Sequence, residues 1–213
     1  MEFQTVGIIG AGAWGTALAI NIARGGKRVI LWSYDGKHKY FDGVDVPENL
    51  TLVADPHDIE NTDVWLDVVP ASYFRETIKK FVGVYKNQPI IICTKGADSR
   101  THEFMSEILK EELSNCVDFG VLSGPQFAAE VARGFPTGST LAGTERTLMA
   151  GRAILNLSQL DETDDIIGAQ ICGVGKNVIA LVAGFLSVKT FGENERAMVF
   201  TQCCNEIINV GLA

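Results

Sequence analysis

Two lysines stand where an amine could take part in proton chemistry, and the first is Lys176. It lies near the start of GVGKNVIALVAG (173–184), a largely apolar run with no carboxylate within four residues of the lysine. Dry surroundings would lower the pKa of this amine from about 10.4 toward neutrality, where a general acid works best. A lysine stem that reaches out to water is the alternative, and position alone leaves the two open. On one face of a helix, the neighbours of this lysine include six small residues: Gly168, Cys172, Gly173, Ala180, Ala183 and Gly184.

The second lysine, Lys95, follows the apolar run PIIICT (89–94) and precedes a glycine. In α/β folds ligands bind beyond the carboxyl ends of the strands, so Lys95 would lie at the rim of a binding crevice. Gly124 and Pro125 open a helix after the apolar run at 117–122, and its N-terminus would face the same crevice. A lysine in a surface loop fits the position of Lys95 equally well.

A glycine pattern near the N-terminus predicts a ligand-binding loop. GIIGAGAWG contains Gly10, Gly12 and Gly15 in the spacing GxGxxG, after a strand-like run at 4–10 and at the start of a helix over 13–25. The first glycine makes the tight turn, the second lets the backbone approach a pyrophosphate, and the third lets helix and strand pack closely. The helix N-terminus adds N–H donors and a positive dipole. The pattern predicts a dinucleotide site, and a glycine-rich turn without a ligand is the alternative.

The residues after the second apolar run, RVILW (28–32), bear on the choice of dinucleotide. An acid there favours NAD, whereas an arginine would accept the 2′-phosphate of NADP. The sequence offers Tyr34 and Asp35, and no arginine follows the strand nearby. The basic residues at 37–39 could still face a 2′-phosphate or form a solvated loop. We therefore expect NAD, with NADP as the alternative.

The elements that must position these residues alternate along the first part of the chain. Strands are predicted at 4–10, 28–32, 51–55, 64–69, 89–94, 117–122 and 139–143, and helices at 13–25, 71–82, 101–113, 126–132 and 145–156. Continuous apolar strands alternating with helices indicate a parallel sheet covered on both faces. The acidic run DETDD (161–165) is interpreted as a solvated turn. Beyond it, two helices are predicted at 166–188 and 193–212. We expect an α/β fold, a Rossmann-like doubly wound parallel sheet (1–165) followed by the start of an all-α C-terminal domain (166–213).

Composition narrows the class of protein. The chain has 213 residues, 46% of them hydrophobic and 21% charged, with a net charge of −8, which disfavours a general nucleic-acid-binding surface. The five cysteines show no metal-ligand spacing, so no metal site is predicted, and their odd number favours free thiols in a reducing compartment. No segment has 18 unbroken apolar residues, and the first six residues leave no room for a signal peptide. We expect a cytoplasmic protein that does not cross a membrane.

Several stretches together resemble the NAD(P)-dependent glycerol-3-phosphate dehydrogenase family. They appear in family order and span nearly the whole chain. They are GAGAWGTALA (10–19), VILW (29–32), VVPASYFRE (68–76), TKG (94–96), LSGPQFAAEVARGFPT (122–137), KNVIALVAG (176–184) and GENERA (192–197). The resemblance implies an oxidoreductase that interconverts sn-glycerol 3-phosphate and dihydroxyacetone phosphate, passing hydride between C2 of this small-molecule substrate and the nicotinamide of NAD(P).

The resemblance also implies roles for single residues. It makes Lys176 the general acid and base, and it places Lys95 near both substrate and cofactor. Cofactor contacts are implied for Ala13 and Trp14 in the glycine loop and for Ala128 after the Gly-Pro turn. Substrate contacts are implied for Gly124, Gln126 and Asn177. A second lysine close to Lys176 would lower the pKa of each amine through like-charge repulsion.

The chain departs from the family pattern at four points. The family usually has Ser or Thr at Gln126, Arg at Tyr34, and Glu at Gln170. The sequence also ends about a hundred residues before family members do, without their GxGDL-like and Ser-Arg-Asn segments. We therefore expect slow turnover or none, and the alternative function is a non-catalytic dinucleotide-binding remnant. The helix at 193–212 should expose apolar residues, which predicts a homo-oligomer.

Overall fold

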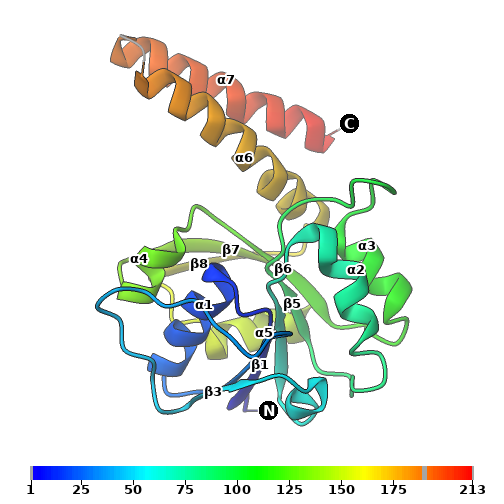
Figure 1. The fold of residues 1–213 in the computed structure, drawn as a ribbon. Coiled ribbons are helices and arrows are strands. Elements are labelled where there is room, and N and C mark those ends of the chain that lie inside the picture. Colours follow the sequence, from blue (N-terminus) through cyan, green and yellow to red (C-terminus); the bar gives the residue numbers. More distant parts are fainter. Residues whose placement is uncertain (1, 189–190, 213) are drawn as a thin grey trace.

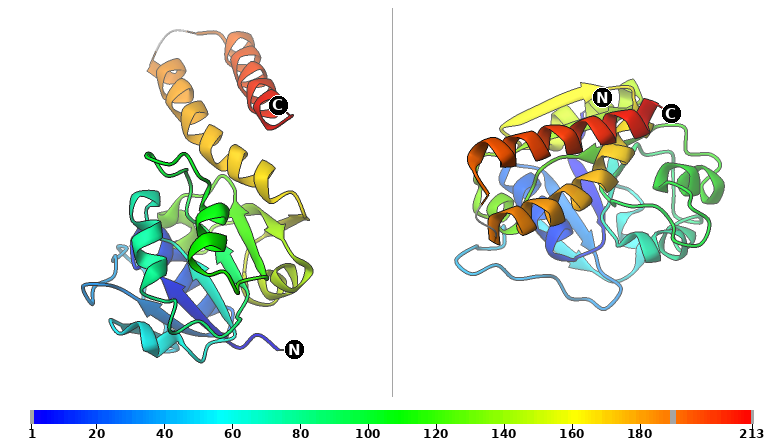
Figure 2. Two further views of the ribbon diagram at one scale, coloured as in Figure 1. Left: turned by 90° about the vertical axis from the view of Figure 1, so that its right-hand side faces the viewer. Right: turned by 90° about the horizontal axis from the view of Figure 1, so that it is seen from above.

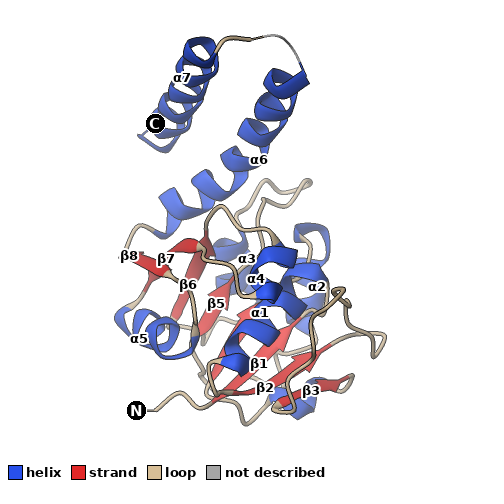
Figure 3. Ribbon diagram, turned by 90° about the vertical axis from the view of Figure 1, so that its left-hand side faces the viewer, coloured by secondary structure: helices blue, strands red, loops and turns tan. Residues whose placement is uncertain are grey.

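An eight-stranded sheet forms the centre of the molecule, with helices on both of its faces (Figures 1 and 3). The structure is a computed structural model that describes residues 2–188 and 191–212. The strand order is β3-β2-β1-β4-β5-β6-β7-β8. Because the order reverses direction next to β1, a crevice opens between the carboxyl ends of β1 and β4.

The elements follow the predicted alternation. The strands are β1 (Thr5–Ile9), β2 (Arg28–Trp32), β3 (Leu50–Val53), β4 (Val64–Asp67), β5 (Ile90–Ile92), β6 (Phe119–Ser123), β7 (Gly138–Gly143) and β8 (Gln159–Thr163). The helices are α1 (Ala13–Arg24), α2 (Ala71–Lys79), α3 (Met105–Glu112), α4 (Ala128–Arg133), α5 (Glu145–Ile154), α6 (Ile166–Val188) and α7 (Glu193–Leu212). A short 3-10 helix, η1 (Pro56–Ile59), was not predicted.

Successive residues of the central strands enter two different cores, because side chains of a strand point alternately to opposite faces of the sheet. Ile8 packs with Leu18 of α1 and Leu148 of α5 on one face. Ile9 packs with Phe74 of α2 and with α3 on the other. The sheet is therefore buried on both sides, as its continuous apolar strands predicted, and the Rossmann-like α/β fold is confirmed.

Two details of the sheet differ from the prediction. First, β7 runs antiparallel to β6, and β8 then runs parallel to β7, so the sheet is mostly rather than wholly parallel. Second, the interpretation of DETDD as a solvated turn is wrong, since Asp161 to Thr163 belong to β8. Charged residues suit an edge strand because they discourage pairing with another chain. Glu162 also pairs with Arg152 of α5, with 2.7 Å between Oε1 and Nε.

Helix α6 leaves the sheet region and pairs with α7, and the pair projects away from the sheet (Figures 1 and 2). The Asp165 carboxylate caps the first turn of α6 by accepting a hydrogen bond from the Gly168 amide at 2.8 Å. Gln170 and Ser106 of α3 exchange two hydrogen bonds, of 3.1 and 2.9 Å. These contacts fix the base of α6 on the sheet region.

The rest of the α6–α7 pair is exposed. Among its described residues, α7 has none that is buried. Large apolar side chains are exposed on both helices, among them Leu181, Phe185, Met198, Ile208 and Leu212. The apolar exposure predicted for 193–212 is thus confirmed, whereas oligomerisation stays a prediction.

Helix α6 also bears on the expectation that no segment crosses a membrane. By length and composition alone it could span one, with a mean hydropathy of 1.8 over its most apolar window. One such helix is weak evidence of a membrane span, and 11% of that window is buried inside the structure. The chain division at residue 165 falls between β8 and α6, and as a domain boundary it stays a prediction.

Candidate active site

The glycine loop joins β1 to α1, and a different physical reason accounts for glycine at each of its three positions. Gly10 has φ +111°, a conformation that favours glycine, and a Cβ there would lie 2.8 Å from the Val68 carbonyl oxygen. At Gly15 a Cβ would lie 1.9 Å from the Gly10 carbonyl oxygen, so helix and strand pack too closely for any side chain. At Gly12 a Cβ would meet nothing within 4 Å. The loop therefore presents bare backbone to an open space at the N-terminus of α1.

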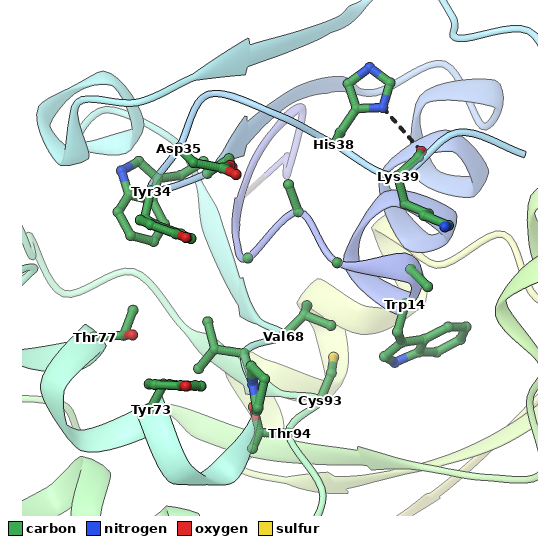
Figure 4. A pocket seen from close by; sticks show the side chains of 18 of the residues that line it. Trp14, Tyr34, Asp35, His38, Lys39, Val68, Tyr73, Thr77, Cys93 and Thr94 are labelled. Atoms are coloured by element: carbon green, nitrogen blue, oxygen red, sulfur yellow. Dashed lines mark hydrogen bonds between the residues drawn. The ribbon is translucent and has the colours of Figure 1, made fainter.

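That open space is a cavity of about 1080 Å³ over the carboxyl ends of the central strands. Figure 4 shows Trp14 on one side of it and Tyr34 and Tyr73 on the other. The lining residues come from the glycine loop (10–14), the segment after β2 (32–35 and 37–39), the segment after β4 (68–70), α2 and its C-terminal end (73, 76, 77 and 80), the segment after β5 (93–95), and residues 126 and 128. The volume lies just above the usual range of about 300–1,000 Å³ for small-molecule and cofactor sites.

Most of the predicted site residues meet in this cavity. Those that line it are Gly10, Gly12, Ala13, Trp14, Tyr34, Asp35, Lys95, Gln126 and Ala128. Gly15 lies behind the loop, where it serves packing. Gly124 lies beside β7, since a Cβ there would be 2.8 Å from the Gly138 carbonyl oxygen. Lys176 and Asn177 lie on α6, outside the lining. The individual roles of these residues stay predictions.

Asp35 stands at the rim of the cavity, one residue beyond the exposed Tyr34. Its Oδ1 accepts hydrogen bonds from the Ser33 hydroxyl at 2.7 Å and from the Lys37 amide at 3.1 Å. These two hydrogen bonds, the hydroxyl's first, hold the pKa of the Asp35 carboxyl below its usual value. Within the described part of the chain Oδ2 forms no hydrogen bond. Asp35 is therefore an ionised acid with one oxygen available to a ligand.

Lys95 lies half-buried at the inner end of the cavity, with its Nζ 5.6 Å from the centroid of the Trp14 ring. Burial lowers the pKa of its amine, and the charge of Lys176 lowers it further. The repulsion expected between the two lysines is thus found for Lys95. Gly173 of α6 passes directly above, where a Cβ would lie 3.8 Å from the Lys95 Cγ. The absence of a side chain at Gly173 brings α6, and with it Lys176, close to this end of the cavity.

Lys176 itself is half-buried, and the neighbouring Asn177 is exposed. The dry setting expected for Lys176 is therefore not found among the described residues. The small residues around it do allow close approach, as predicted. At Gly175 a Cβ would lie 2.5 Å from the Ile207 side chain, so α7 packs directly on the α6 backbone.

Two buried polar atoms at the cavity have no hydrogen-bond partner among the described residues, the Trp14 Nε1 and the Gln126 Oε1. The Gln126 Nε2, by contrast, donates to the Ser139 hydroxyl. Unpaired buried polar groups cost free energy, and a partner supplied by a bound ligand or water would account for these two in residues that line one cavity. One is a donor and the other an acceptor, so the cavity suits a ligand with both kinds of group, as a dinucleotide has. The residues present therefore fit the implied cofactor.

One wall of the cavity, which comes from α2, was not predicted from the sequence. Tyr73, Glu76, Thr77 and Lys80 line it, at the spacing of one helical face. Their position in the sequence could have indicated them, because α2 begins at Ala71, shortly after the end of β4. Asp67, at the end of β4, was missed as well. It is fully buried, and burial raises the pKa of its carboxyl to about 7, although the hydrogen bond between Asp67 and Thr94 acts in the opposite direction. The sequence feature that could have indicated Asp67 is that it is the single acid in the apolar run VWLDVV (64–69).

A doubly wound sheet with a bare glycine loop over its crevice places the chain in the Rossmann class of dinucleotide-binding proteins. The sequence profile of the NAD-dependent glycerol-3-phosphate dehydrogenase N-terminus matches residues 5–149, and that of the C-terminus of the same enzymes matches 165–213. The chain belongs to this family.

Individual relatives agree with the assignment. The glycerol-3-phosphate dehydrogenase [NAD(P)+] of Parvibaculum lavamentivorans is 32% identical over 228 residues, which cover 100% of this chain and 68% of that protein. The enzyme of the same name from Bradyrhizobium is 34% identical over 225 residues, covering 99% and 69%. The crystal structure of glycerol-3-phosphate dehydrogenase from Coxiella burnetii has a TM-score of 0.84 at 30% identity, covering 96% of this chain and 67% of that one.

Proposed function

We propose that this chain binds NAD(H) in the cavity over β1 and β4 and interconverts sn-glycerol 3-phosphate and dihydroxyacetone phosphate. The observation that carries the proposal is the joint lining of one cavity by the glycine loop, Asp35 and Lys95, with α6 bringing Lys176 close to the same end. The family supports the choice of substrate, since the relatives are named as glycerol-3-phosphate dehydrogenases.

The chain's own groups divide the task of holding the cofactor. The N–H groups at the start of α1 and the bare backbone at Gly12 would take the pyrophosphate. The Asp35 Oδ2 would accept a hydrogen bond from the adenosine ribose. Trp14, beside Lys95, and Gln126 would offer their unpaired donor and acceptor. When bound, the nicotinamide gives or accepts the hydride at C2 of the substrate.

The two lysines supply the charge and the proton that the carbonyl needs. Negative charge grows on the carbonyl oxygen during reduction, and an ammonium within hydrogen-bond reach stabilises it. We assign proton donation to Lys176, and to Lys95 the stabilisation of charge beside the cofactor. In the reverse direction Lys176 accepts the proton of the C2 hydroxyl.

A second function, dinucleotide binding with little turnover, is favoured for this polypeptide by the exposure of its α6–α7 pair. Lys176 is half-buried and Asn177 is exposed, so water reaches the proposed proton donor and weakens its electrostatic effect. Among the described residues the cations that line the cavity are lysines or the histidine at 38, and no arginine is present for bidentate contact with a substrate phosphate. We infer that the 213-residue polypeptide binds NADH and turns over slowly.

One assay separates these two functions. NADH oxidation is followed at saturating dihydroxyacetone phosphate, with NADH binding measured in parallel by quenching of tryptophan fluorescence. We expect binding together with slow oxidation, which Lys176→Met abolishes without changing the affinity for NADH. Normal binding with no oxidation above the Lys176→Met background leaves the binding function alone. The absence of binding contradicts both functions.

We further infer a soluble cytoplasmic protein that self-associates through the exposed faces of α6 and α7. All five cysteines are free, which suits a reducing compartment. Apolar patches of this kind mark interaction sites. Gel filtration without detergent should give a dimer or larger species. A clean monomer contradicts self-association, and recovery only in the membrane fraction contradicts solubility.

A further inference from the structure

Asp67 is an acid in a place where an ionised group is costly. It ends β4 in the middle of the sheet, with Ile9 of β1 and Ile92 of β5 as its neighbours in the strand register, and it is fully buried. No lysine or arginine forms an ion pair with it in the described part of the chain. The ionisable side chains on the adjacent strand end are Cys93 and Lys95, and burial raises the pKa of the Cys93 thiol. An unpaired buried carboxylate is strongly disfavoured, so the setting favours a neutral acid.

The hydrogen bonds around Thr94 lead to the same conclusion by counting protons. The Thr94 Oγ1 lies 2.5 Å from the Asp67 Oδ2 and 2.6 Å from the Val69 carbonyl oxygen. A hydroxyl carries one hydrogen, and a carbonyl oxygen can only accept. Both short contacts can be hydrogen bonds at the same time only if Thr94 donates to the Val69 carbonyl and a protonated Asp67 carboxyl donates to Thr94. The resulting chain runs from the Asp67 carboxyl to the Thr94 hydroxyl and on to the Val69 carbonyl.

This chain joins two segments that line the cofactor cavity. Thr94 immediately precedes Lys95 after β5, and Val69 immediately precedes Pro70 at the start of α2. The two segments are packed closely, because a Cβ at Gly96 would lie 3.1 Å from the Ala71 Cβ. Asp67 itself does not line the cavity. It lies beneath both segments and contacts the hydroxyl that connects them.

We propose that Asp67 is a positioning residue whose carboxylic acid proton completes a hydrogen-bonded chain through Thr94 to Val69, and that this chain fixes Lys95 against the α2 wall of the cofactor cavity. The positioning of Lys95 for chemistry rests on the proposed function, whereas the protonated acid and the shape of the cavity do not.

Two pairs of variants test the proposal through NADH affinity. Asp67→Asn keeps a neutral donor to Thr94, and Thr94→Ser keeps the hydroxyl, so both should bind NADH within about twofold of the unsubstituted protein. Asp67→Ala and Thr94→Val each break the chain and should weaken binding by about fivefold, as expected for one lost hydrogen bond. If Asp67→Ala does not fold, the Thr94 pair carries the same comparison. Asp67→Asn binding as weakly as Asp67→Ala would overturn the proposal.

Infrared spectroscopy tests the proton directly and needs no turnover. The difference spectrum between the unsubstituted protein and Asp67→Asn, recorded about one unit below the raised pKa of Asp67, should contain the carbonyl stretch of an un-ionised carboxylic acid. A carboxylate band in its place would overturn the proposal while leaving the proposed function standing. Conversely, a protein with the acid band and no turnover contradicts the proposed enzyme activity alone.

Discussion

The sheet region and the α6–α7 pair carry one lysine each toward the same end of the cavity, but they differ in how they surround it. Lys95 lies between Trp14 and the strand ends, and burial lowers the pKa of its amine. Lys176 lies on a helix of which only four residues are buried, and it is itself half-buried. The proposed cofactor site is therefore formed within the sheet region, whereas the proposed proton donor lies on a helix pair that is largely exposed.

The prediction with the largest expected effect concerns Asp67, the buried acid of the sheet region. Its pKa is about 7 in the folded protein and about 3.8 when unfolded, so the folded state holds the proton more tightly. The stabilisation is complete below the unfolded value and is lost as pH rises toward 7, where the folded carboxyl also ionises. As pH rises between these two values, the free energy of unfolding of the unsubstituted protein should therefore fall by up to about 4 kcal/mol relative to that of Asp67→Asn.

Urea unfolding at a series of pH values measures this difference. Tryptophan fluorescence reports on the correct region, since all three tryptophans lie before residue 66. A difference between the two proteins that does not change with pH would show that Asp67 is not a buried neutral acid.

The next largest effect distinguishes packing from ligand binding within the glycine loop. Gly15→Ala places a Cβ 1.9 Å from the Gly10 carbonyl oxygen and should cost about 3 kcal/mol of unfolding free energy. Gly12→Ala places a Cβ in open space and should leave the melting temperature nearly unchanged while weakening NADH binding. Thermal melts and NADH titrations of both variants test the pair. A large loss of stability in Gly12→Ala would contradict the assignment of that space to a ligand.

These glycines show what could be predicted from the sequence. The spacing of Gly10, Gly12 and Gly15 between a strand and a helix is a local pattern, and the structure places the loop as that pattern predicted. Asp35 and Lys95 were found for a similar reason, since each follows directly after a strand whose carboxyl end faces the crevice.

What was missed depends on contacts between distant segments. The acidic β8 pairs with β7 at the edge of the sheet, and nothing in its composition distinguishes an edge strand from a turn. The interplay of Asp67 with Thr94 joins residues 27 positions apart. The open setting of Lys176 likewise depends on packing, because a run of small apolar residues fits a buried helix and an exposed one equally well.

A smaller effect concerns the choice of dinucleotide at the rim of the sheet region. The ionised Asp35 should repel a 2′-phosphate, so NADH should bind more tightly than NADPH. Asp35→Asn should narrow this preference by about tenfold, mainly through better NADPH binding beside the basic residues at 37–39. Dissociation constants for both cofactors measure the ratio. An unchanged ratio in Asp35→Asn would place the source of selectivity elsewhere.

The smallest effect belongs to the α6–α7 pair. Replacing glycine by alanine within a helix stabilises the folded protein by about 1 kcal/mol. Gly184→Ala should give this stabilisation, because a Cβ there meets nothing within 4 Å. Gly175→Ala should not, because its Cβ would lie 2.5 Å from the Ile207 side chain. Circular dichroism melts compare the two variants, and both should bind NADH like the unsubstituted protein. Equal melts would contradict the packing of α7 on α6 at this point.

The central claim is that the sheet region forms a complete dinucleotide site around its glycine loop. Titration of the 213-residue protein with NADH, followed by tryptophan fluorescence, tests it most directly because Trp14 lies in the cavity wall. We expect saturable quenching in the unsubstituted protein and weaker binding in an equally stable Gly12→Ala variant. No saturable binding, or equal binding by both proteins, would contradict it.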